Sequence, residues 1–153
     1  MRAYRVEAIR RIEERAIAEQ GVDALMQRAA AAVAASAFDL LRTTTGGRYG
    51  RRVMIMVGAG NNGGDALFAG VRLARRGVRV TAVRCLGTPH PAGSAALVAA
   101  GGRVVDLDDS ITQLPCDLVI DGILGIGGRP GLPDQVAQLV ASVEHRGDRK
   151  SVV

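Results

Sequence analysis

The residues best suited to chemistry in this chain lie in two glycine-rich loops, each directly after an apolar stretch. In the first, Val53–Val57 is followed by Gly58-Ala59-Gly60-Asn61-Asn62-Gly63-Gly64-Asp65 and then by a helix-like segment from Ala66 to Arg76. A strand, a glycine-rich turn and a helix, in that order, direct backbone N–H groups and the positive end of a helix dipole to one place. The first loop is therefore a candidate phosphate site.

The side chains of this loop offer more than a turn requires. Gly58, Gly60 and Gly63 match the G-x-G-x-x-G dinucleotide pattern in its strand–turn–helix context. The same three glycines also fit a tight turn in which they only relieve steric strain. Asn62 adds an amide oxygen that suits a hard cation, and Asp65 is placed to favour the helix dipole as a first-turn acid.

The second loop runs from Asp121 to Gly131 and follows the apolar run Leu118–Ile120. Asp121 should lie at the carboxyl end of a central strand, the edge at which open α/β sheets bind ligands. A carboxylate there is partly desolvated and needs a cation or a hydrogen-bond donor, although loop N–H groups alone would also satisfy it. The amides of Gly125 to Gly131 are placed to surround a phosphate, and Arg129 adds positive charge.

Strands and helices alternate through most of the chain. We expect an amphipathic helix over residues 5–19, a second helix over 24–41 capped by Asp23, and then strands at 52–57, 78–83, 103–107 and 117–121 with helices at 65–76, 92–100 and 134–145. This alternation predicts βαβ crossovers and a parallel sheet. Residues 150–153 read as the opening of one more buried strand, so we expect the domain to be incomplete at its C-terminal end.

Composition excludes several classes of protein. The 153 residues suit one domain. No run approaches the roughly 20 apolar residues of a membrane span, and no hydrophobic signal core follows Met1, so we expect a cytoplasmic protein without a membrane partner. The net charge of +5 comes from scattered arginines with almost no aromatic residues, which argues against nucleic-acid binding.

The two cysteines and the two histidines carry little functional signal. Cys85 and Cys116 lie at or beside expected strands and are interpreted as buried, because two cysteines provide neither a disulfide framework nor a metal cluster. His90 and His145 lack acidic neighbours and are interpreted as surface residues.

The two loops resemble those of a known family, the YjeF N-terminal domain or NAD(P)H-hydrate epimerases. Gly58–Asp65 is similar to the family's hallmark, Asp121 with Gly125–Gly131 resembles its second motif, and Leu25–Ala30 resembles its N-terminal helix signature. The resemblance covers the chain from end to end. It implies a Rossmann-like three-layer α/β/α sandwich with a mostly parallel sheet, preceded by two N-terminal helices, as a single epimerase domain over residues 1–153.

The resemblance also implies a function and a site. The family interconverts the R and S epimers of hydrated NADH or NADPH, a repair step that lets a dehydratase consume both, and it typically binds potassium. The residues that would hold the hydrated dinucleotide are Asn61, Asn62, Gly63, Gly64 and Asp65 with Gly125, Ile126, Gly127, Gly128, Arg129, Pro130 and Gly131. Asn62 and Asp121 would coordinate K⁺, and Asp121 is the candidate for moving the hydroxyl proton.

The sequence departs from the family pattern in two places. The family continues past the last expected strand into an Asp-Leu-Pro-Ser-Gly-like segment, which supplies a further substrate contact and a further potassium ligand. This chain stops before that segment, so we expect an incomplete dinucleotide site, and in many bacteria a dehydratase domain is fused to this one. Ala66 replaces a usual glycine.

Two other functions remain open, together with an expectation about assembly. The chain could be a non-catalytic nucleotide- or protein-binding module on the same fold. It could also be an NADP-dependent oxidoreductase, since Arg84 stands where a ribose-binding acid would and suits a 2′-phosphate, although no Tyr-x-x-x-Lys follows. An incomplete sheet leaves an unpaired edge and apolar faces, so we expect self-association into a homo-oligomer.

Overall fold

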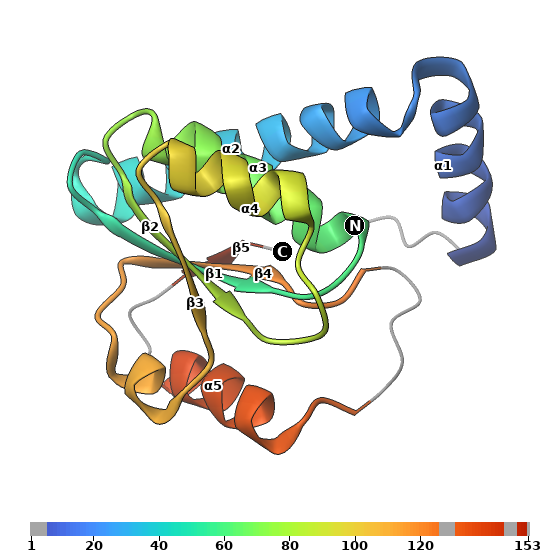
Figure 1. Cartoon of the computed structure of the whole chain (residues 1–153). Helices are drawn as coiled ribbons and strands as arrows, with labels where there is room; N and C mark the ends of the chain where they lie inside the picture. The colour runs from blue at the N-terminus through green and yellow to red at the C-terminus, as the bar shows by residue number, and fades with distance from the viewer. Residues whose placement is uncertain (1–5, 126–130, 146–149, 153) are drawn as a thin grey trace.

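The computed structural model describes residues 6–125, 131–145 and 150–152 and contains one parallel sheet between two helical layers (Figure 1). Five strands form the sheet in the order β3-β2-β1-β4-β5. Their bounds are β1 Arg52–Val57, β2 Arg79–Arg84, β3 Arg103–Asp106, β4 Leu118–Gly122 and β5 Lys150–Val152. Every neighbouring pair is parallel. The expected α/β class is confirmed, including a strand at the last residues of the chain.

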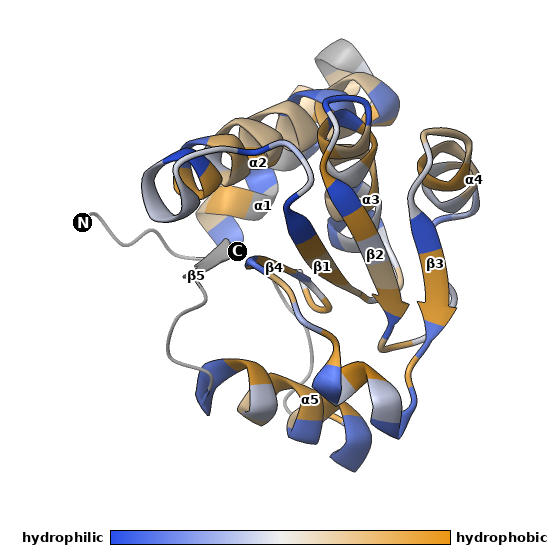
Figure 2. Ribbon diagram, turned by 90° about the vertical axis from the view of Figure 1, so that its left-hand side faces the viewer, coloured by the Kyte–Doolittle hydropathy of each residue, from blue (hydrophilic) through white to orange (hydrophobic). Residues whose placement is uncertain are grey.

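The helices cover the two faces of the sheet unequally. The helical bounds are α1 Val6–Gln20, α2 Val22–Thr45, α3 Asn61–Ala74, α4 Pro91–Ala99 and α5 Asp134–His145, with a short 3₁₀ helix η1 at Asp109–Gln113. Figures 1 and 2 show α2, α3 and α4 together on one face and α5 on the other. The three-layer sandwich with two preceding helices is therefore confirmed.

Residues of β1 alternate between two hydrophobic cores. Val53, Ile55 and Val57 pack with α2, α3 and α4. Met54 and Met56 point to the opposite face and pack with Val136 and Leu139 of α5. Because both faces of the strand are covered, its apolar run is continuous rather than alternating, as is usual for the central strand of a parallel sheet.

Helix α2 is longer at both ends than the sequence predicts. Asp23 is not its cap: the capping position is Gly21, with φ of 81°, and Asp23 lies in the first turn, where its charge favours the dipole. At the other end, the hydroxyls of Thr43, Thr44 and Thr45 each donate to a carbonyl four residues back, so the threonines complete the last turn. The helix then ends at Gly46, with φ of 73°.

Helix α2 packs one of its faces into the core of the fold. By length and apolar composition it is long enough to cross a membrane. However, Ala30, Ala34, Ala37 and Leu41 are buried in the same core as β1 and α3. This burial is typical of the core helix of a folded domain.

Helix α3 begins at Asn61, four residues before the expected start, so Asn61 to Gly64 belong to its first turn rather than to a loop. Gly60 makes the turn, with φ of 90°. Gly63 is needed for a different reason, because a Cβ atom there would collide with the carbonyl oxygen of Gly58. The glycines thus let the first turn of the helix sit directly against the end of β1.

Gly58→Ala should lower the free energy of unfolding by at least about 2 kcal/mol, because the new methyl group would overlap backbone atoms that cannot move aside. A Cβ atom at Gly58 would fall on the carbonyl oxygen of Ile123. Urea unfolding followed by far-UV circular dichroism measures the change.

Gly47→Ala is the matched control. A Cβ atom at Gly47 would meet nothing within 4 Å, so its unfolding free energy should stay within about 0.5 kcal/mol of the parent. Equal stability of the two variants would contradict the close contact at Gly58.

Candidate functional site

The two glycine loops lie side by side at the carboxyl edge of the sheet. The Gly58 N–H donates to the Gly122 carbonyl at 2.9 Å. A Cβ atom at Gly122 would lie 2.7 Å from the Cβ of Ala66, and one at Gly125 would lie 3.3 Å from the Cβ of Asn62. The end of β4 therefore packs closely on the start of α3, with the β-carbons of Ala66 and Asn62 at the contact.

A cavity of about 440 Å³ opens beside this junction. Its polar wall consists of Ala59, Asn61, Asn62, Asp65 and Gly125, and its apolar wall consists of Ile17, Val22, Leu25, Met26 and Ala29. A cavity of this size, with few polar groups on one side and an apolar wall on the other, is typical of small-molecule sites. We call it the edge cavity.

The N-terminus of α3 faces the edge cavity without a side-chain cap. Its capping residue is Gly60, which makes no side-chain hydrogen bond to the first turn. The first N–H groups of a helix have no partner within the helix. Together with the helix dipole, they attract a phosphate or another anionic oxygen.

Asn62 and Asp121 both hold the turn between the two loops. The Asn62 Nδ2 donates to the carbonyl of Leu124 at 3.0 Å. The Asp121 Oδ1 accepts from the N–H of Ile123, also at 3.0 Å. Each side chain thereby fixes a backbone group of residues 123–124.

Asp121 nevertheless lies on the other face of the sheet from the edge cavity. Its register partner in β1 is Met56, which packs in the α5 core, and Asp121 does not line the edge cavity. The structure thus brings Asn61, Asn62, Asp65 and Gly125 together and places Asp121 across the turn from them.

The donor chemistry of Asn62 and Asp121 fits a potassium ion. Among the residues that the structure describes, Ile123 is the only recorded hydrogen-bond donor to Asp121, so Oδ2 keeps its lone pairs. An amide oxygen and a carboxylate oxygen are hard ligands of the kind that group I and II cations prefer. Over the same described residues, no cluster of three or more His, Cys, Asp or Glu side chains is present, so the carboxylate-rich set of a divalent site is not formed there.

Cys85 lies at the same edge, on the α5 face. Burial raises the pKa of its thiol to about 11; a hydrogen bond with the Val57 backbone opposes the rise, and the charge of Asp121 adds to it. A thiol with this pKa is protonated at neutral pH and is not a nucleophile. Cys85 therefore serves packing, as interpreted from the sequence.

Arg84 and His90 both have hydrogen-bond partners within the protein. Arg84 forms an ion pair with Asp106 at 2.6 Å, so a 2′-phosphate would have to compete with that carboxylate. The sequence predicts His90 to be a surface residue, but the structure gives it a structural role. Its Nδ1 accepts a hydrogen bond from the N–H of Gly93 at 3.1 Å and so caps α4. His145 is exposed, as expected.

Part of the second loop lies outside the described residues. This applies to the predicted site residues Ile126, Gly127, Gly128, Arg129 and Pro130. Gly131 is described and has φ of 99°, a conformation that favours glycine. Its predicted role in holding a phosphate stays a prediction.

The apolar wall of the edge cavity was not predicted as part of the site. Leu25 and Met26 belong to the segment that resembles the family's helix signature, yet periodicity alone assigns them to a core face. Met26 reaches Gly64, where a Cβ atom would lie 2.9 Å from its terminal methyl. The missing side chain at Gly64 was the available signal that another element packs on the start of α3.

Asn62→Ala should loosen the turn at residues 123–125, because the Leu124 carbonyl loses its side-chain donor. The expected cost is about 1 kcal/mol of unfolding free energy, with faster amide hydrogen exchange at Ile123 to Gly125. Asn61→Ala, at an exposed neighbouring position, is the control and should leave exchange at this turn unchanged. Identical exchange in both variants would contradict the role assigned to Asn62.

Comparison with known proteins places this site in a family context. Residues 22–153 match the family described as YjeF-related protein N-terminus. The chain is 42% identical over 144 residues to the bifunctional NAD(P)H-hydrate repair enzyme Nnr of Mycobacterium tuberculosis, covering 92% of this chain and 29% of that protein. It is 43% identical over 126 residues to the NAD(P)H-hydrate epimerase of Microbacterium testaceum, covering 82% and 46%.

The chain spans less than half the length of these curated relatives. Among solved structures, the yeast protein ynu0 (YNL200c) is similar, with a TM-score of 0.80 and 18% identity, covering 99% of this chain and 68% of that one. This likeness concerns the fold. Because the family match runs from the start of α2 to the last residue, the chain belongs to the YjeF-related protein N-terminus family.

Proposed function

We propose that this chain is the substrate-binding part of an NAD(P)H-hydrate epimerase, an isomerase that interconverts the R and S epimers of hydrated NADH and NADPH. The observation that carries the proposal is the edge cavity, in which an uncapped helix start and the side chains of Asn61, Asn62 and Asp65 face an apolar wall. Relatives named NAD(P)H-hydrate epimerase and NAD(P)H-hydrate repair enzyme support it.

The two walls of the edge cavity suit the two kinds of surface in a hydrated dinucleotide. The start of α3 presents N–H groups and a positive dipole end to a phosphate. The apolar wall, including Leu25 and Met26, suits a ring. Asp65, on the second turn of α3, is placed to accept from a ribose hydroxyl.

The reaction itself needs a group that gives one proton to the leaving oxygen and later takes one back, rather than a redox group. Breaking the C6–O bond of the hydrated ring, with help from the lone pair of the adjacent nitrogen, releases the oxygen as water once it is protonated. Water that returns to the opposite face and loses one proton gives the other epimer, so atoms and electrons balance. Among the described residues, no hydrogen-bond donor is shown on Oδ2 of Asp121, and we assign this carboxyl group to hold and return that proton.

Potassium would be held by the Asn62 amide oxygen and by Oδ2 of Asp121. When bound, it would supply positive charge next to the carboxylate and so strengthen the binding of anionic or hydroxyl oxygens. Asn62 and Asp121 themselves keep the turn at residues 123–124 in place through their hydrogen bonds.

The test of this function is a coupled assay. A mixture of R and S hydrated NADPH is given to excess S-specific dehydratase in potassium buffer, with and without this chain, and NADPH formation is followed by absorbance. The same assay is run on a chimera that adds the segment following the matched region in the M. tuberculosis relative. Consumption of the R epimer by the chain or by the chimera supports the proposal, and consumption by neither favours a non-catalytic binding module.

Asp121→Asn should lower the rate of epimerisation by at least about 100-fold in whichever form is active, since it removes the proton acceptor while keeping an oxygen for the Ile123 N–H. The substrate KM should change much less, because Asp121 does not line the edge cavity. Asp106→Asn, a charge-matched change at the exposed end of β3, is the control. Full activity in Asp121→Asn would overturn the assignment.

Replacing potassium by the smaller lithium ion at constant ionic strength should reduce epimerisation and should lower thermal stability slightly, since a bound ion stabilises the folded state. In Asn62→Ala the thermal midpoint should no longer respond to potassium. A response of equal size in parent and variant would place the ion elsewhere.

A further inference from the structure

A second cavity lies at the opposite end of the sheet from the edge cavity. Its volume is about 480 Å³. It lies on the face of the sheet that α5 covers. Its apolar floor includes Met54, Leu114, Pro115 and Cys116. Its polar lining includes Arg52, Arg79 and Arg103. We call it the arginine cavity. Nothing in the proposed epimerase reaction uses it.

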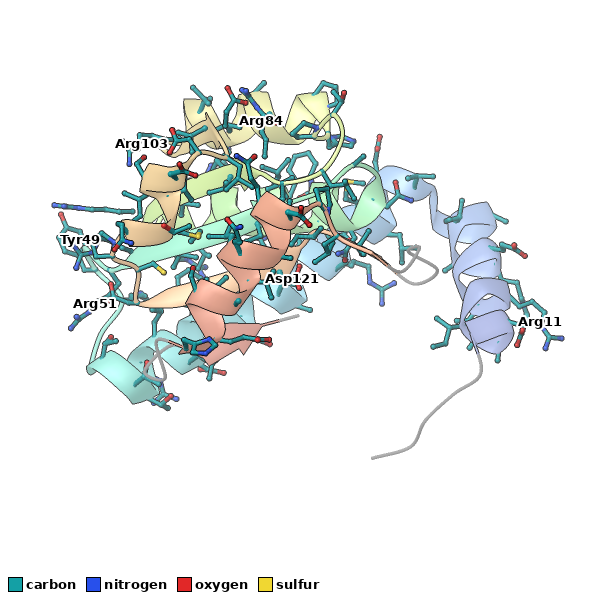
Figure 3. The ribbon with its side chains drawn as sticks, turned by 90° about the horizontal axis from the view of Figure 1, so that it is seen from below. Arg11, Tyr49, Arg51, Arg84, Arg103 and Asp121 are labelled. Carbon is teal, nitrogen blue, oxygen red and sulfur yellow. The ribbon has the colours of Figure 1, made fainter. Side chains whose placement is uncertain are left out.

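The sheet register places the three arginines side by side. Arg52 of β1 is paired with Arg79 of β2, and Arg103 of β3 is paired with Thr81 of β2, so all three follow the same face as Met54. Figure 2 shows the first ends of β1, β2 and β3 side by side, and all three are hydrophilic. In Figure 3, Arg103 and the neighbouring Arg51 lie at one end of the molecule, away from Asp121.

Like charges on directly paired strand positions destabilise a sheet. Among the described residues, no carboxylate neutralises the three arginines. None of Arg52, Arg79 and Arg103 forms an ion pair with a described carboxylate. Asp117, the acid nearest the start of β1, accepts from the Arg52 N–H at 2.7 Å and pairs with the Arg51 guanidinium at 3.8 Å. Arg103 donates to the hydroxyl of Thr81 at 3.4 Å.

We propose that the arginine cavity binds a small organic phosphate, with its phosphate on the three guanidinium groups and its ring over the apolar floor. Planar guanidinium groups match phosphate oxygens in pairs. A purely apolar ligand would leave the arginines uncompensated, and inorganic phosphate would leave the floor bare. The volume is within the range of small-molecule sites. The proposal is independent of the epimerase function.

Each cavity is lined by one methionine, whose methyl group can report ligand binding by NMR. Met54 lines the arginine cavity and Met26 lines the edge cavity. With ¹³C-methyl-labelled methionine, the few methyl signals of the chain are assigned by substitution, and each cavity is read separately. ADP is the probe, and adenosine and inorganic pyrophosphate are its two halves.

The expected result is a saturable shift of the Met54 methyl with ADP, weaker binding with pyrophosphate, and no shift with adenosine. Arg79→Gln should weaken the ADP response of Met54 about tenfold or more, because a charged hydrogen-bond donor is lost. Arg75→Gln, at the exposed residue that caps the C-terminus of α3, removes the same charge and should leave the response unchanged. The Met26 and Met56 signals show in each variant that the fold is kept.

Three results would overturn the proposal. They are an unmoved Met54 methyl at millimolar ADP, an equal response in Arg79→Gln and the parent, and a response to adenosine as strong as that to ADP. A shift of Met26 alone would place ADP in the edge cavity; it would overturn the arginine cavity as a phosphate site without affecting the proposed function.

Discussion

The rest of the structure depends on one constraint, the contact of three backbones at Gly58. The N–H of this residue bonds to Gly122 of β4, and its carbonyl touches Gly63 in the first turn of α3. No side chain fits between these segments. The contact fixes where α3 starts, how closely β4 approaches β1, and therefore where the edge cavity opens. A residue with a Cβ atom at any of these glycines would separate the elements and move the polar wall away from the apolar wall.

The sequence predicted the elements well because their periods and glycines are local signals. Helix 134–145 and strand 52–57 were predicted within their observed bounds, and the layered fold with its parallel sheet was confirmed. The start of α3 was wrong because glycines were interpreted as loop residues, whereas Gly63 and Gly64 are helical and accommodate Gly58 and Met26. The apolar wall of the edge cavity was missed because it depends on how α2 crosses α3, a long-range contact whose local sign is the missing side chain at Gly64.

Long-range packing also explains why the role of the many arginines could not be predicted from the sequence. Arg48 and Arg76 lie over the ring of Phe38, at 5.2 and 5.0 Å from its centroid, so part of the positive charge serves the packing of α2. Arg52 and Arg79 are neighbours only through the sheet register. These arginines are scattered in the sequence and have different surroundings in the fold: the first pair packs on an aromatic ring, and the second pair borders the arginine cavity.

The position of Asp121 across the turn from Asn62 limits how a substrate can sit. The edge cavity lies on the α2 and α3 side of the sheet, and Asp121 lies on the α5 side. A molecule that reaches both must cross the carboxyl edge over residues 122–125. Gly122 and Gly125 add no side chains to that path, and the hydrogen bonds to Ile123 and Leu124 hold the backbone of the turn in place. Under the proposed function, the ion and the reacting group of the substrate would lie over this edge, between Asn62 and Asp121.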